Sequence, residues 1–253
     1  MIYDYLQRGV LAGVGAGIAY GLYMLLVGNP LSEYAHEAGH DHGHGHEHAG
    51  HGHEQAHAVS ETTTAIVSVG SGILWAIFLG GLFALTLYLF EPALPGTSDV
   101  KSFVLAGAGF LTVSATPWLV LPPATPGAEQ LYTIETRLAI YVGLVAVGAI
   151  VSAMAILAYN RLAPRHPAAG VVAGAIPIAA VVSVVPLATP TVVTHPELPS
   201  ALVAVYQSLA ILSQAAIWLV LATTFNWLQR RAASTTNSHT QSTDSHETTA
   251  TGS

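Results

Sequence analysis

The sequence predicts an all-α integral membrane protein with about six transmembrane helices. Mean hydropathy is positive, at +0.53, and Asp, Glu, Lys and Arg make up only 8% of the 253 residues. Charged residues make up about a quarter of an ordinary soluble domain. A membrane crossing needs about 20 predominantly apolar residues. Six windows meet that requirement: Gly9–Val27, Ala65–Phe90, Ser102–Leu121, Leu138–Tyr159, Ala168–Leu187 and Ala201–Phe225.

The same composition excludes several classes of protein. There is no cysteine, so disulfides and thiolate sites are ruled out, and a Cu(I) or iron–sulfur centre is disfavoured. The formal net charge of −7 is concentrated in loops and termini. No basic patch of the kind that binds nucleic acid is present.

The windows divide the chain into four parts. Residues 1–30 form a first transmembrane helix, which we expect to be retained because its apolar run is too long for a signal peptide and no clear cleavage site follows. Residues 31–64 form a His-rich external loop, and residues 65–228 form a five-helix membrane bundle. Residues 229–253 are rich in Ser and Thr without apolar residues to bury, which predicts a disordered cytoplasmic tail.

The basic residues predict the orientation in the cell membrane, because cytoplasmic segments carry an excess of Lys and Arg. If the amino terminus is inside, the external segments carry one basic residue, Arg137. The cytoplasmic segments then carry the other six, namely Arg8, Lys101, Arg161, Arg165, Arg230 and Arg231. Both termini are therefore predicted to be cytoplasmic, and the three polar connections that follow the first, third and fifth windows are predicted to lie outside.

The first two windows carry small residues at a spacing of four, which forms a flat helix face in each. The first has Gly9, Gly13, Gly17 and Gly21, and the second has Ser68, Gly72, Ala76, Gly80 and Ala84. Small residues at this spacing let membrane helices approach closely. We expect the two faces to meet each other, or one of them to meet a partner subunit in an oligomer.

Between these windows, residues His36–His57 form a polar segment with no Lys or Arg. Nine of its 22 residues are His, four are Asp or Glu, and five are Gly. Neutral imidazole and carboxylate are ligands for borderline divalent metals such as zinc, nickel and cobalt. The predicted metal ligands are His195 in a later loop and nine His in this segment: His36, His40, His42, His44, His46, His48, His51, His53 and His57. A dispensable metal buffer and a pH sensor are alternative roles for the segment.

Two pentapeptides in this segment match H-E-x-x-H, the spacing that places two His on one helix face for zinc with Glu as general base. They are His36–His40 and His53–His57. Their position in a polar loop, and the lack of an obvious third ligand in another window, argue against an intramembrane metalloprotease. A segment so rich in His and Glu also produces such matches by composition alone. We therefore predict that the protein is not an enzyme.

The other external connections supply candidate residues for a transport path. Pro122, Pro123 and Gly127 lie in a stiff loop after the third window, and Glu197 lies two residues after His195. Glu135 and Arg137 lie just before the fourth window. Their side chains either extend to the membrane interface, as ionisable groups at a membrane boundary commonly do, or form a gate pair at the external mouth. Gln214 lies near the middle of the last window, where an amide bonds another helix or lines an ion path.

The order and spacing of several short motifs resemble the CbtA family of probable cobalt transporter subunits. The resemblance rests on Asn29–Glu37 after a Gly-rich first window, on Leu121–Gly127 followed by Arg137 and Tyr141, and on Glu197–Leu202. Ser208, Leu209 and Trp218 recur at similar offsets. The chain departs from the family pattern near Tyr206, where members often carry Arg, and in its six windows, where the family is often described with five spans.

The resemblance implies uptake of cobalt linked to cobalamin supply, often beside a small one-span CbtB-like subunit. Residues and spacing by themselves indicate a divalent-metal-binding membrane protein, with nickel or zinc as other possible ions. Membrane lipid is its expected environment. A metal-buffering or sensing accessory protein without its own flux is the main alternative. No Walker motif is present in the sequence, so ATP-driven transport would need another subunit.

Overall fold

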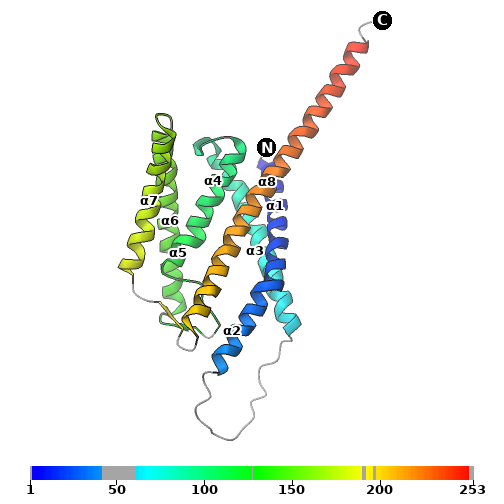
Figure 1. The fold of residues 1–253 in the computed structure, drawn as a ribbon. Helices are drawn as coiled ribbons and strands as arrows, with labels where there is room; N and C mark the ends of the chain where they lie inside the picture. Colours follow the sequence, from blue (N-terminus) through cyan, green and yellow to red (C-terminus); the bar gives the residue numbers. More distant parts are fainter. Residues whose placement is uncertain (1, 42–60, 127, 190–191, 196–197, 251–253) are drawn as a thin grey trace, which may run out of the picture.

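The computed structural model of the chain describes residues 2–41, 61–126, 128–189, 192–195 and 198–250. Long helices run side by side, and a short two-stranded ribbon lies at one end of the molecule (Figure 1). The helices are α1 (Ile2–Tyr23), α2 (Asn29–Asp41), α3 (Glu61–Phe90), α4 (Ser98–Phe110), α5 (Thr116–Trp118), α6 (Ile134–Leu162), α7 (Pro167–Ala188) and α8 (Ser200–Ala250). Shorter turns are η1 (Met24–Gly28), η2 (Glu91–Ala93) and η3 (Leu111–Ala115), and the strands are β1 (Glu129–Gln130) and β2 (Val193–Thr194).

Within the described residues, six helical segments are long and apolar enough to cross a membrane, which confirms the predicted fold class. They are Ile2–Ala35, Val69–Ala93, Ser98–Trp118, Ile134–Leu162, Pro167–Ala188 and Ser200–Ser234. The fifth contains Pro177 and Pro186 within a continuous helix. The fifth predicted window is thus one continuous helix despite its two prolines.

The first helix continues beyond its predicted end at Val27. It passes through η1, a π-helical turn, into α2 and ends at Asp41. The expectation that residues 31–41 belong to a loop is therefore wrong, and the backbone of His36–His40 is helical. The rest of the His-rich segment, including His53–His57, lies outside the described residues.

Both π-helical turns end two residues before a proline. The turn η1 precedes Pro30, and η3 precedes Pro117. A proline ring clashes with the carbonyl four residues earlier in a regular helix, and a wider turn just before it gives that carbonyl room. At Pro117 the freed carbonyl is that of Val113, which accepts a hydrogen bond of 3.1 Å from the Tyr141 hydroxyl of α6. The Tyr141 hydroxyl thus supplies a donor to a carbonyl that cannot accept a hydrogen bond from the nitrogen of Pro117.

The small-residue faces of α1 and α3 meet, as predicted. A Cβ atom added to Gly13 would lie 2.6 Å from the carbonyl oxygen of Ala76, and one added to Gly17 would lie 3.0 Å from the Cα of Ile73. A Cβ atom on Gly80 would overlap the backbone of Gly9 and Gly13. The two backbones touch along this line, so glycine is required there for steric reasons.

The buried core joins α1, α3, α4 and α8. Phe225 and Leu221 of α8 are fully buried, and the Phe225 ring lies edge-on to Phe83 of α3 at a centroid distance of 5.6 Å. Leu105 of α4 and Ala16 of α1 belong to the same cluster. These four helices form the packed part of the molecule, which we call the four-helix group.

Helices α6 and α7 form a hairpin beside the four-helix group (Figure 1). Helix α7 packs chiefly on α6, where Gly174 faces the carbonyl of Ala155. Helix α6 approaches η3 closely, because a Cβ atom on Gly148 would lie 2.8 Å from the Cα of Thr112. The hairpin is thus attached to the rest of the chain mainly through η3 and α5.

Helix α8 runs to Ala250, and its last turns extend beyond the other helices (Figure 1). The prediction that residues 229–253 are disordered is therefore wrong as far as Ala250. Extending an existing helix adds one hydrogen bond for each residue fixed, whereas starting a new one is costly. A polar segment that directly follows a membrane helix can continue it for this reason.

Candidate functional site

Two of the three polar connections predicted to lie outside, those after the third and fifth windows, meet in the antiparallel β1–β2 ribbon. Glu129 is opposite Thr194, and Gln130 is opposite Val193. The Leu131 amide extends the pairing by donating to the carbonyl of Val192 at 3.1 Å. We call this part of the molecule the ribbon end, and the part near the start of α1 the opposite end (Figure 1).

His195 follows directly after β2 at the ribbon end. Its side chain is half-buried, and its Nε2 atom is buried without a hydrogen-bond partner among the described residues. Pro122 and Pro123 are half-buried, and the carbonyl of Pro123 accepts a bond of 3.4 Å from the Gln207 side chain of α8. Gly127 and Glu197, also predicted for this site, lie outside the described residues.

Glu135 and Arg137 lie in the first turn of α6. The hydroxyl of Thr133 caps this helix by accepting a bond of 3.4 Å from the Thr136 amide. Glu135 is exposed beside the helix start, where a carboxylate is favoured by the helix dipole. Arg137 is half-buried, with its Nε atom buried and unpartnered. In the described chain the two side chains form no ion pair with each other.

Gln214 is half-buried in α8 and makes no side-chain hydrogen bond to another described residue. Its neighbour Ser213 faces a cavity of about 80 Å³ between α1 and α8, which Tyr20 and Tyr23 also line. The Tyr23 hydroxyl donates to the carbonyl of Leu209 at 3.2 Å. The polar side chains of this interface are thus contributed by α1 as well as by α8.

The predicted loop ligands are placed only in part. His36 and His40 lie one turn apart on the backbone of α2, whereas His42, His44, His46, His48, His51, His53 and His57 lie outside the described residues. Among the residues that are described, no group of three or more His, Asp or Glu side chains is arranged to hold a metal ion. The loop site stays a prediction.

A second polar region lies at the opposite end and was not predicted. Glu91 accepts a hydrogen bond of 2.9 Å from the Tyr5 hydroxyl of α1, and it lies 3.7 Å from the Lys101 ammonium of α4. These side chains line an open cavity of about 580 Å³ together with Asp4 and Arg8. Sequence reasoning missed this region because its members come from three helices that are far apart in the chain.

Helices α4 and α8 are also joined by polar contacts at the opposite end. The Arg230 guanidinium contacts the carboxylate of Asp99, with an Nε–O distance of 3.3 Å. The Asn226 amide donates to the carbonyl of Asp99 at 3.2 Å. Together with Glu91, these contacts join α1, α3, α4 and α8 at this end.

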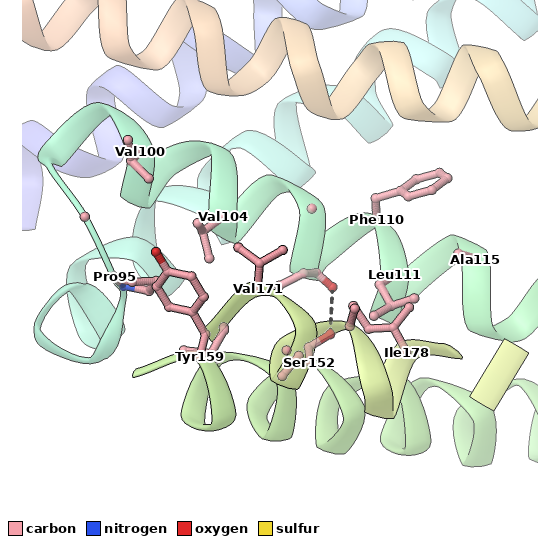
Figure 2. Close-up of a pocket in the computed structure, with 17 residues that line it drawn as sticks. Pro95, Val100, Val104, Phe110, Leu111, Ala115, Ser152, Tyr159, Val171 and Ile178 are labelled. Atoms are coloured by element: carbon pink, nitrogen blue, oxygen red, sulfur yellow. Dashed lines mark hydrogen bonds between the residues drawn. The ribbon is translucent and has the colours of Figure 1, made fainter. Parts of the chain in front are cut away.

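Two apolar cavities lie on either side of the contact between α4 and α6. One of about 610 Å³ separates α4 from the α6–α7 hairpin (Figure 2), and one of about 490 Å³ lies among α3, α4, α6 and α8. Ser152 and Ala108 line both cavities. The Ser152 hydroxyl donates to the carbonyl of Ala108 at 3.3 Å and lies 3.2 Å from the hydroxyl of Thr112. This short polar contact is what separates the two cavities.

Comparison with protein families identifies the whole membrane part of the chain. The model described as "Probable cobalt transporter subunit (CbtA)" matches residues 2–230. A comparison with curated proteins and one with solved structures gave no match.

Proposed function

The chain belongs to the CbtA family of probable cobalt transporter subunits, and from this premise we propose that it imports divalent cobalt into the cell. The observation that carries the proposal is the family match over residues 2–230, which includes all six membrane-spanning helices. Cobalt is the cargo in this proposal, with nickel and zinc as competing ions. The protein is a membrane component of a transport system, and we propose that it catalyses no chemical reaction.

The proposed orientation places the ribbon end outside the cell. Lys101 and Arg230 lie at the opposite end, in ion pairs with Glu91 and Asp99, and Arg161 and Arg165 lie at the turn between α6 and α7. Arg137 is at the ribbon end. This segregation supports a cytoplasmic location for the opposite end, because positive residues are retained inside.

We propose that the His-rich segment captures the ion. Its nine His and the acidic residues Glu33, Glu37, Asp41, Glu47 and Glu54 would raise the local metal concentration. Helix α2 leads toward the same end of the molecule as the ribbon (Figure 1). This shared position supports transfer of the ion from the segment to His195 and Glu197.

The proposed mouth lies between the stiff loop of residues 122–127 and the start of α6. The ribbon and the bond from Gln207 to Pro123 hold this loop against the β2 connection and α8. Glu135 and Arg137 would act there as separate charged groups that admit or repel the ion. Gln214 would line the path further along α8, and this step has the least support.

A further subunit is expected to complete the transporter. The family description names a subunit, and the sequence holds no Walker motif for ATP binding. We propose a small one-span CbtB-like partner. The two apolar cavities beside α4 are surfaces on which a membrane helix could pack.

A metal-buffering accessory role is the second candidate. It is favoured by the nine His of the segment, which can bind metal whether or not an ion crosses the membrane through this chain. In that role the His-rich segment would bind metal without flux through this chain.

Radiolabelled cobalt uptake tests the two functions. Cells would express the wild type, a variant with the nine segment His replaced by Asn, or Arg137→Ala, each with and without the partner subunit. We expect the His variant to lose uptake only at low external cobalt, and Arg137→Ala to lose it at all concentrations. An absence of uptake in every arm, with the protein present in the membrane, would leave the accessory role.

A further inference from the structure

Buried polar atoms without hydrogen-bond partners gather at the ribbon end. Eight such side-chain atoms occur among the described residues, and four of them belong to Thr125, Gln130, Arg137 and His195. These residues lie on the stiff loop, on β1, at the start of α6 and directly after β2. The opposite end, in contrast, contributes one atom to this set, the Oδ1 of Asn226.

An unpartnered buried polar atom needs an explanation, because it has lost its bonds to water without gaining others. Leaving such an atom unpaired is unfavourable. In a native protein such an atom commonly marks a place where a water molecule or an ion binds. Several at one place, on different elements, therefore indicate a binding site.

The ribbon register brings two of these side chains onto one face. Gln130 is opposite Val193, and side chains alternate between the two faces along an extended strand. His195, two residues after Val193, thus shares the face of Gln130. Diagonal neighbours of this kind are about 7–8 Å apart at the backbone, within reach of long side chains.

The unpartnered atoms on this face are metal ligands by their chemistry. They are the Nε2 of His195 and the Oε1 of Gln130. A neutral imidazole nitrogen suits cobalt, nickel and zinc, and an amide oxygen is a harder, uncharged ligand. Thr125, which is 4% exposed with an unpartnered hydroxyl, belongs to the same end and is able to bond a metal-bound water.

We propose that Gln130 and His195 together bind a partly hydrated divalent transition-metal cation on this face of the ribbon. The proposal rests on the function proposed above, to which it adds Gln130 as a ligand. Two uncharged protein ligands make a weak site. Weak binding suits a station that receives an ion and then releases it along a path.

The opposite face of the ribbon provides the control. Glu129 and Thr194 occupy it, and Glu129 is exposed. A negative carboxylate attracts a cation more strongly than an amide does, so a diffuse electrostatic effect would depend on Glu129. A defined site on the proposed face depends on Gln130 instead.

Cobalt binding to the full-length protein in lipid nanodiscs tests the proposal. The nine segment His are first replaced by Asn, which leaves His166, His195, His239 and His246. Calorimetric titration with Co²⁺ then measures the remaining affinity. We expect His195→Ala and Gln130→Leu to weaken it, by about tenfold or more for the imidazole and less for the amide. Glu129→Gln and His166→Ala should leave it within about twofold of the parent, since neither removes a ligand.

Other outcomes would overturn the proposal. These are the absence of Co²⁺ binding once the segment His are replaced, or a loss of affinity in Glu129→Gln but not in Gln130→Leu. Thermal unfolding shows whether each variant folds. If Gln130→Leu fails to fold, Gln130→Glu is used in its place, and this variant should bind Co²⁺ more tightly. Uptake assays separate this result from the function. Uptake that persists without Gln130 and His195 contradicts the site alone, whereas Co²⁺ binding without uptake contradicts import alone.

Discussion

The four-helix group and the α6–α7 hairpin are built from equally apolar sequences but are packed in different ways. In the four-helix group, α1 and α3 touch along their backbones, and α8 buries Leu221 and Phe225 fully. The hairpin contacts its neighbours mainly around η3 and is flanked by cavities of about 610 and 490 Å³. Hydropathy places both regions in the membrane and does not distinguish them.

The difference shows what fixes helices to one another in lipid. Apolar side chains gain little by leaving lipid for a protein interior, so close fit and hydrogen bonds decide which helices associate. The α1–α3 contact has close fit from Gly9 to Gly21. The hairpin has close fit to the rest of the chain at Gly148, together with hydrogen bonds from Ser152, Tyr141 and Asn160. The hairpin is therefore the part held to its neighbours by fewer close contacts.

Breaking the backbone contact of α1 and α3 should have the largest effect on stability. Gly13→Leu places a side chain where even a Cβ would lie 2.6 Å from the Ala76 oxygen, so we expect a loss of at least about 3 kcal/mol, or no folded protein. Gly143→Leu on α6 is the matched control, because nothing lies within 4 Å of a Cβ at that position. Thermal unfolding in nanodiscs measures both. Equal losses in the two variants would contradict the contrast between the two regions.

Removing one polar contact of the hairpin should have an intermediate effect. Tyr141→Phe removes the hydroxyl that donates to the Val113 carbonyl, which cannot accept a bond from the nitrogen of Pro117. We expect a loss of about 1–2 kcal/mol. Tyr132→Phe serves as the control, since Tyr132 is exposed in the connection before α6. If both variants unfold like the wild type, the bond to Val113 does not help to hold the hairpin.

The features that could be predicted from the sequence are local ones. Each span is one apolar run, and the spacing of four between Gly9, Gly13 and Gly17 is visible without any partner. The helical continuation to Asp41 was not predicted, because the Gly and His content of the His-rich segment favours a loop. The extension of α8 was not predicted either, because the tail is rich in Ser and Thr without apolar residues to bury.

The features that were missed depend on contacts between distant segments. Gln130 carries no signal by itself, and only its register opposite Val193 places it on the face of His195. The family motifs named Arg137 and Tyr141, but the role of Tyr141 required the position of the Val113 carbonyl. Glu91 likewise carries no signal by itself, and its partners Tyr5 and Lys101 come from α1 and α4.

The smallest expected effect concerns the opposite end, where polar contacts replace backbone fit. Glu91→Gln keeps an acceptor for the Tyr5 hydroxyl and loses only the charge that faces Lys101 at 3.7 Å. Because both side chains are partly exposed, we expect a loss of no more than about 1 kcal/mol, which added salt should reduce further. Denaturation at low and high salt measures this, with Glu129→Gln as a control for the loss of an exposed charge at the other end. A normal stability with impaired cobalt uptake would change the conclusion: Glu91 would then act in transport, and the polar cavity around it would be the place where the ion leaves the protein.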